Sequence, residues 1–144
     1  QGNIFHYACE FGTEVTVKLL LQIANKYNID LNLRNIYGNT PFHRACYFGK
    51  LQTVEILLKN SKKHKINVVS LNNFGKDGQA DAEEKGHTDV VKLIKDWKRK
   101  QPNEELTRRI HDEILFQLEN SEQSGNPRIA SAIKLIKELK ENTN

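Results

Sequence analysis

One segment of the chain occurs twice, 37 residues apart. Residues 5–12 read FHYACEFG and residues 42–49 read FHRACYFG, and further matches at the same offset extend to Ile29 and Ile66. A third, weaker copy begins near residue 75, one more period along the chain. Two successive periods without a gap predict a repeat architecture, in which each unit buries its apolar face against the next unit.

Each copy predicts two helices and an extended arm. Thr40-Pro41 marks a helix start, because the hydroxyl can cap free N–H groups and proline suits the first helical turn. Gly49 ends this helix after about two turns, since glycine adopts the left-handed conformation cheaply. Residues 54–58 then place three apolar side chains on one face of a second helix. The chain between one helix pair and the next has an extended pattern that closes in a turn, at Gly38 in the first arm.

These motifs resemble a known repeat. Residues 38–49, GNTPFHRACYFG, are similar to the ankyrin-repeat signature with its Thr-Pro-Leu-His core, and residues 83–94 resemble the second half of a terminal ankyrin repeat. The resemblance covers about residues 1–98 and implies an all-α solenoid of about three helix pairs. We expect a stack over residues 1–100, with copies at about 1–37, 38–74 and 75–98.

Two features depart from the ankyrin pattern. The period is 37 residues rather than about 33, which predicts an extra helical turn near Ile23–Lys26 and Asn60–Lys63. The third copy has Asp77-Gly78-Gln79 where the family has Thr-Pro-Leu. We therefore expect the first helix of the third copy to be short or frayed.

Residues 101–144 show a different pattern. Apolar residues spaced by four predict an amphipathic helix over roughly 103–120, and Asn126-Pro127 begins a second helix after a polar loop. The two predicted stripes are Leu106, Ile110, Ile114 and Leu118, and then Ile129, Ile133, Ile136 and Leu139. Helices of this length do not fit an ankyrin unit, so the segment predicts an αα-hairpin. Such a hairpin could cap the exposed end of the stack, dock a partner, or pair two chains as a homodimer.

Two His/Cys pairs are the best candidates for chemistry. His6 and Cys9, and likewise His43 and Cys46, have helical spacing, and two histidines with two thiolates could form a tetrahedral zinc site. The ankyrin resemblance implies instead that the histidine bonds backbone and that the cysteine fills a small packing position. A buried thiol also lacks the lowered pKa and exposure of a nucleophile. Glycines at 75–78 lack the spacing of a phosphate loop. We therefore predict no catalytic residues, no metal and no cofactor.

The composition indicates an intracellular protein, cytoplasmic or nuclear. Two cysteines are too few for a disulfide framework and suit a reducing compartment. No apolar run approaches the roughly 20 residues of a membrane helix, and no signal-peptide pattern is present. Because the chain starts at Gln1 and contains no methionine, we expect it to be a fragment of a longer protein.

The net charge of +4 is uneven, with +5 over residues 1–99 and −1 over residues 100–144, and two basic clusters lie at predicted helix ends. Cations are favoured at a helix C-terminus, which accounts for both clusters without a ligand. Binding to an acidic surface or nucleic acid is the alternative, although the basic bias alone is too weak to indicate nucleic acid. The clusters are Lys59, Lys62, Lys63, His64 and Lys65, and then Lys95, Lys98, Arg99 and Lys100.

The function that these features predict is a non-catalytic module that binds another protein. In the ankyrin family, partners usually contact the arm tips and the groove formed by the first helices. The matching arm-tip positions here are Arg34, Ile36, Tyr37, Asn39, Leu71, Asn73, Phe74 and Lys76. The matching helix positions before the turn glycine are Glu10, Phe11, Tyr47, Phe48, Glu84 and Lys85. Tyr37 and Tyr47 are the strongest candidates, because aromatic residues dominate binding energy at interfaces, whereas Phe11 and Phe48 could equally be packing residues.

Overall fold

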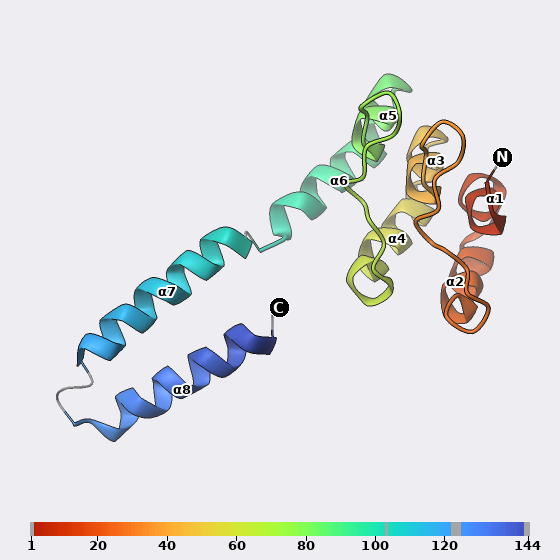
Figure 1. The fold of residues 1–144 in the computed structure, drawn as a ribbon. Helices are drawn as coiled ribbons and strands as arrows, with labels where there is room; N and C mark the ends of the chain where they lie inside the picture. The colour runs from red at the N-terminus through yellow and green to blue at the C-terminus, as the bar shows by residue number, and fades with distance from the viewer. Residues whose placement is uncertain (1, 103, 122–124, 143–144) are drawn as a thin grey trace. The chain divides into compact units, whose positions relative to one another are not determined.

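The computed structural model describes residues 2–102, 104–121 and 125–142 of the chain. These residues form eight helices and no β-strand (Figure 1), which confirms the predicted all-α class. Contacts divide the chain into two compact units, residues 1–100 and 101–144. The first unit is the repeat stack, and the second is a helical hairpin.

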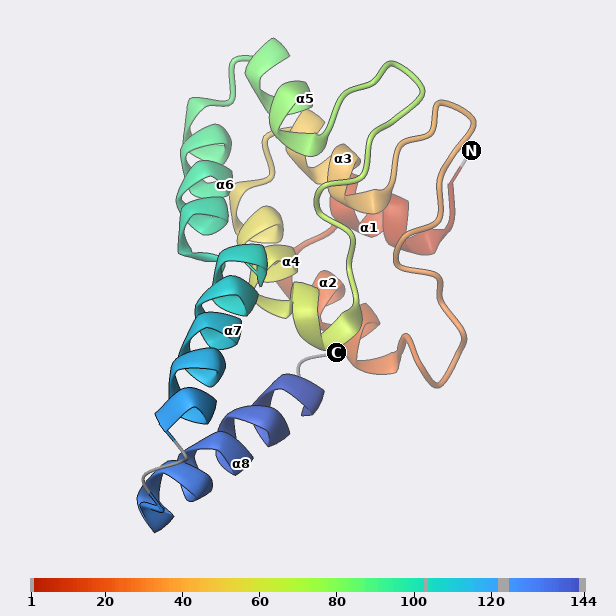
Figure 2. The same ribbon diagram turned by 60° about the vertical axis from the view of Figure 1, so that its left-hand side comes forward.

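The stack consists of three helix pairs in two layers. Figure 2 shows the first helices of the three copies next to one another in one row, with the second helices in a second row beside them. The pairs are α1 (Ile4–Phe11) with α2 (Glu14–Ile23), α3 (Pro41–Tyr47) with α4 (Leu51–His64), and α5 (Gly78–Glu84) with α6 (Thr88–Lys100). Each helix packs on its equivalent in the next copy, as the repeat predicts.

The core of the stack is made of positions that are buried in every copy. Burial of one such leucine contributes roughly 1.5–3 kcal/mol to folding, and the 37-residue period places equivalent side chains above one another. Two of these columns are Ala8, Ala45 and Ala82, and then Leu20, Leu57 and Ile94.

Every first helix begins at a side-chain cap in the same register. Asn3 and Thr40 each accept the backbone N–H three residues on, in capping boxes with His6 and His43. In the third copy, Asp77 accepts the N–H of Ala80 at 2.9 Å and replaces the threonine. A carboxylate cap is as effective as a hydroxyl.

The expectation of a short or frayed first helix in the third copy is wrong. Helix α5 has seven residues, as does α3. Gly78 takes the place of Pro41, and an added Cβ at Gly78 would lie 2.7 Å from Cε1 of Phe42. The glycine therefore allows α5 to pack closely on α3, and this packing compensates for the weaker sequence signature.

The extra turn predicted from the long period is present in both copies but is α-helical in only one. Helix α4 continues through residues 60–63, whereas α2 ends at Ile23 and is followed by hydrogen-bonded turns. Both segments close on a left-handed residue in the same register, Asn28 with φ +50° and Lys65 with φ +53°. The prediction is therefore confirmed for α4. For α2 the extra turn exists, but the prediction that it is helical is wrong.

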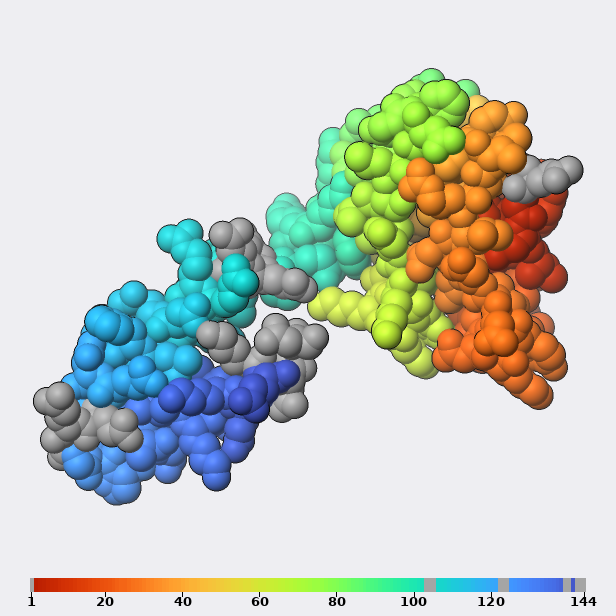
Figure 3. All heavy atoms as spheres, viewed as in Figure 1, coloured from red at the N-terminus to blue at the C-terminus, as the bar shows by residue number. Residues whose placement is uncertain are grey.

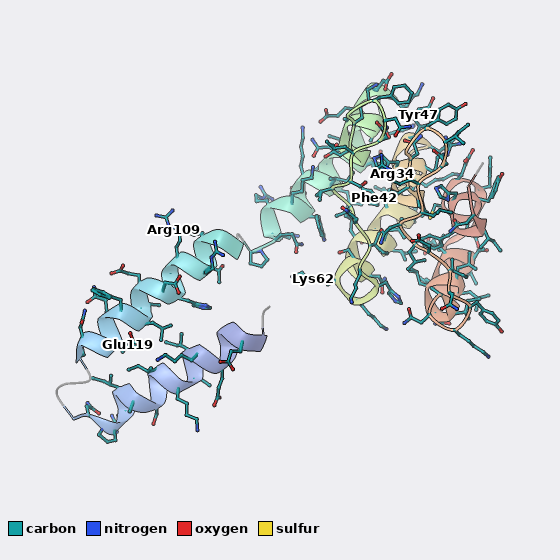
Figure 4. The ribbon with its side chains drawn as sticks, in the orientation of Figure 1. Arg34, Phe42, Tyr47, Lys62, Arg109 and Glu119 are labelled. Atoms are coloured by element: carbon teal, nitrogen blue, oxygen red, sulfur yellow. The ribbon has the colours of Figure 1, made fainter. Side chains whose placement is uncertain are left out.

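The hairpin consists of α7 (Glu104–Ser121) and α8 (Pro127–Asn142), which pack on each other. Lys137 and Glu119, the latter labelled in Figure 4, form an ion pair of 2.9 Å across it. Ile133 is buried as predicted, but the buried residue of α7 is Leu115 rather than a member of the predicted stripe. Two helices can cover only a narrow strip of each other, so Leu106, Ile110 and Ile114 stay exposed. The side chain of Leu139 lies outside the described residues.

Candidate protein-interaction surface

Two arms connect the copies, over residues 24–40 and 65–77. In each arm an asparagine closes the terminal turn with its side chain. Oδ1 of Asn35 accepts the backbone N–H groups of Tyr37 and Asn39, and Oδ1 of Asn72 accepts those of Phe74 and Lys76. The turn glycines have positive φ, +75° at Gly38 and +71° at Gly75.

Hydrogen bonds join the two arms, which lie against each other as orange and green surfaces in Figure 3. Nη1 of Arg34 donates to the carbonyl of Leu71 at 2.7 Å. Asn73 donates through its side chain to the carbonyl of Ile36 and through its backbone to that of Tyr37. Arg34 and Asn73, both predicted as partner-binding, thus already hold the arms in place.

The arm tips expose four large apolar side chains. Their exposed fractions range from 52% to 70%, for Ile36, Tyr37, Leu71 and Phe74. Asn39 and Lys76 are less available to a partner. Asn39 accepts a hydrogen bond from Asn72 at 2.9 Å, and Lys76 pairs with Glu84 at 2.6 Å.

Buried histidines bind the arms to the helices. Nε2 of His6 lies 2.9 Å from the carbonyl of Asn39, and Nε2 of His43 lies 3.1 Å from that of Lys76. Burial lowers the pKa of both histidines, so both rings are neutral at neutral pH. Since a carbonyl only accepts, each Nε2 must carry the proton. The backbone contact implied by the family resemblance is confirmed.

Aromatic and cationic side chains gather where the first helices end. We name Phe11, Arg44, Tyr47, Phe48 and Lys85 the aromatic ridge. The rings of Phe11 and Phe48 are 6.2 Å apart, and those of Tyr47 and Phe48 are 5.1 Å apart in an edge-to-face arrangement. Lys85 Nζ lies 4.6 Å from the centre of the Tyr47 ring. The ridge thus combines one residue from the first copy, three from the second and one from the third.

Arg44 organises the ridge, although the sequence analysis did not select it. Its guanidinium binds Glu10 through Nε at 2.9 Å and Nη2 at 2.6 Å, and it lies 4.7 Å from the centre of the Phe48 ring. Glu10 is only 8% exposed, and its charge is balanced by Arg44. It therefore supports the position of Arg44 from below the ridge. The spacing of Arg44 to Tyr47 and Phe48, three and four residues, could have indicated this contact.

The two phenylalanines of the ridge are not residues of the buried core. Phe11 is 69% exposed and Phe48 is 38% exposed. Residues that served only to pack the core would be buried, as Phe5 and Phe42 are. His87, another residue missed from sequence, fixes the ridge from the third copy, because its Nε2 lies 3.0 Å from the carbonyl of Tyr47.

The two cysteines are fully buried and unpaired with each other. Burial raises the pKa of both thiols, and the nearby Asp81 adds to the effect at Cys46. Neither thiol therefore has the properties of a nucleophile. Across the described residues, no group of three or more His, Cys, Asp or Glu side chains has a geometry that could hold a metal ion.

The first basic cluster lies far from the ridge. Lys62 and Lys63 occupy the last turn of α4, and Figure 4 shows Lys62 and Tyr47 at opposite edges of the second copy. Lys59 pairs with Glu55 at 2.8 Å. Trp97, near the second cluster, packs against the core of the stack.

The comparisons with known proteins agree with the repeat seen here. Residues 1–70 match the family model described as ankyrin repeats (3 copies). Residues 1–70 therefore carry ankyrin repeats, and the match supports a protein–protein interaction module. No curated protein matches the sequence.

A solved structure gives a more particular likeness. It is a chain of the complex of the predatory endopeptidase Bd0816 from Bdellovibrio bacteriovorus with the immunity protein Bd3460, 28% identical in sequence with a TM-score of 0.55. The similarity covers 67% of this chain and 47% of that one, so the chain spans about half the length of its neighbour. Within the described residues, every helix is too short or too polar to cross a membrane.

Proposed function

We propose that the stack is a non-catalytic module that binds a partner protein across the aromatic ridge and the arm tips. The observation that carries the proposal is the exposure of Phe11 and Phe48, with the half-buried Tyr47 between them and two cations beside them. Exposed aromatic residues held in place by neighbours lose little entropy on binding, and together with arginine they dominate interface energetics. The ankyrin match and the protein complex of the structural neighbour support the same class of function.

The ridge also indicates what kind of segment it would bind. The charge of Arg44 is balanced by Glu10, whereas Lys85 lies over the Tyr47 ring, and a hydrogen bond to the Tyr47 side chain raises the pKa of Lys85. A partner segment with an apolar side chain next to a carboxylate would satisfy both features. The apolar group would lie on Phe11 and Phe48, and the carboxylate would pair with Lys85.

Affinity capture from cell extract with the full chain tests the proposal. We expect Lys85→Glu to weaken retention of the captured protein, because a charge that attracts the carboxylate then repels it. Lys63→Glu, at the far end of α4, is the matched control with the same charge change.

The alternative is binding of nucleic acid or an acidic surface at the basic cluster. It predicts that Lys63→Glu weakens binding more than Lys85→Glu does. It also predicts that affinity falls steeply as the salt concentration rises, because phosphate contacts release counterions. Retention that depends on Lys63 and not on Lys85 would contradict the proposed function.

A further inference from the structure

Each copy of the repeat has a rear face, which packs on the preceding copy. Gly78 defines it in the third copy, because an added Cβ would lie 2.7 Å from Cε1 of Phe42 and 2.9 Å from Sγ of Cys46. In the second copy the equivalent residue is Pro41, which is fully buried. In the first copy it is Ile4, and Ile4 is 60% exposed.

A second position shows the same difference between the first copy and the later copies. Arg44 of the second copy reaches back to Glu10 of the first copy, and its equivalent in the third copy, Asp81, is buried. The first copy has Tyr7 at this position, with 53% of its surface exposed. A residue that contacts the preceding copy elsewhere in the stack thus has no such contact here.

The second helices repeat the pattern. Ile56 of α4 is 8% exposed, whereas Leu19, its equivalent in α2, is 53% exposed. Thr53 and Val90 are buried, whereas their equivalent Thr16 is exposed. At four equivalent positions of the repeat, the side chain is therefore more exposed in the first copy than in the later copies.

The opposite side of the stack differs in its sequence. Where the first two copies bury a phenylalanine, a cysteine and a leucine against the next copy, the third has Gln79, Glu83 and Lys95. A solenoid remains soluble when its terminal repeat has a polar outer face. The third copy has such a face, but the first copy keeps apolar residues on its rear face. The buried residues of the first two copies are Phe5, Cys9 and Leu21, and then Phe42, Cys46 and Leu58.

We infer that the rear face of α1 and α2 is a stacking surface for a further helix pair of the same repeat. Its occupant is carried by the same chain ahead of α1 and lies in the same direction as the other copies. The surface continues the established interface between copies, side chain for side chain. It would receive a phenylalanine and a small residue from the occupant, in the way that Gly78 lies against Phe42 and Cys46 of the second copy.

A second copy of this chain does not provide the complementary surface in the head-to-tail sense. The forward faces of the first two copies are already covered, and the forward face of the third is polar through Gln79, Glu83 and Lys95. These residues are charged or strongly hydrated and already bond to one another and to Lys98, so burying them against Ile4 and Leu19 would remove their hydration without giving them a new polar partner. This favours an occupant in the same chain over head-to-tail assembly.

A chain in which a duplicate of residues 1–38 replaces Gln1 tests the inference. Gly38 then supplies the turn glycine, and the 37-residue register continues into Gly2. We expect amide exchange in α1 to slow at least tenfold compared with the original chain, and all three cysteines to resist thiol reagents in the native state. The duplicated cysteine would be covered by Ile4, as Cys9 is covered in the original stack.

Two variants of the original α2 give the matched comparison. Leu19→Glu changes the stacking surface, whereas Val15→Glu changes a position whose equivalent in the second copy, Gln52, is exposed. In the extended chain we expect Leu19→Glu to lower the melting temperature by several degrees more than Val15→Glu. In the original chain the two variants should have similar effects.

Several outcomes would overturn the inference. One is a duplicate that adds no helical ellipticity or leaves its cysteine reactive, and another is an equal effect of the two variants in the extended chain. A third is an original chain that sediments as a dimer and is dissociated by Leu19→Glu but not by Val15→Glu. The surface would then pair two chains. None of these measurements involves a binding partner, so they leave the proposed function of the ridge untouched.

Discussion

The stack and the hairpin are both built from antiparallel helix pairs, yet they bury their apolar residues very differently. In the stack, α3 and α4 are covered on two sides, and Leu57 and Val54 are fully buried. Among the described residues of the hairpin, the buried hydrophobic side chains are Leu115 and Ile133. A helix pair thus acquires a core only when it has neighbours, which is the reason that repeats need to stack.

Truncating the core should separate the two regions most clearly. We expect Leu57→Ala to cost about 3–4 kcal/mol of the free energy of unfolding, because it leaves a cavity between copies. Urea unfolding followed by the fluorescence of Trp97 measures this, since the single tryptophan packs against the stack core. Leu115→Ala is the matched control and should shift this transition by less than about 1 kcal/mol. Equal losses of unfolding free energy in the two variants would contradict the difference in burial between the stack and the hairpin.

Asp81 gives a second test of burial in the stack, because burial changes the pKa of its carboxyl group. Burial raises the pKa of Asp81 to about 6, and the neighbouring Glu84 and Asp77 add to the effect. An acid whose pKa is higher in the folded state destabilises the fold as the pH rises from its unfolded value, about 4, to its folded value. Asp81→Asn should therefore match the wild type near pH 4 and exceed its free energy of unfolding by up to about 3 kcal/mol near pH 7, at roughly 1.4 kcal/mol per pKa unit. Urea titrations at both pH values measure the difference, and a difference that does not change with pH contradicts the account.

Gly78 tests how tightly the copies pack. In a helix, replacing glycine by alanine ordinarily adds up to about 1 kcal/mol of stability. Here the new methyl group would collide with Phe42, which is buried and cannot move freely. We expect Gly78→Ala to destabilise the stack by about 1–2 kcal/mol, as measured by chemical unfolding. A stabilising effect would show that the contact between α3 and α5 is looser than described.

The repeat itself could be predicted from the sequence because it depends on local signals that recur at a fixed period. Caps, turn glycines and apolar stripes all act within one copy, and the helix pairs followed from them. The frayed helix was predicted wrongly because Asp77 and Gly78 lack the family signature, yet one caps the helix and the other permits close packing between copies. That second contribution depends on Phe42, a residue of another copy.

The candidate site was predictable only in part, for a related reason. The exposed positions on the arms follow from the family pattern, but the roles of Arg44 and His87 depend on contacts between copies. Glu10 was predicted to face a partner and is instead buried beneath Arg44. Likewise, the sequence stripe of α7 missed Leu115, because the angle at which two helices pack is not encoded in the spacing of one of them.

The most direct test of the account compares two double variants in binding a captured partner protein. Tyr37→Ala/Tyr47→Ala removes one aromatic group from an arm tip and one from the ridge, and should weaken binding by more than about tenfold. Its melting temperature should stay within a few degrees of the wild type, because Tyr37 is exposed and Tyr47 lies outside the buried core of the stack, and substitutions away from the core usually cost little stability. Lys62→Ala/Lys63→Ala, in the last turn of α4, should leave the dissociation constant nearly unchanged in the same titration. If the lysine pair weakens binding and the tyrosine pair does not, the partner binds at the basic cluster and the ridge is not the interaction surface.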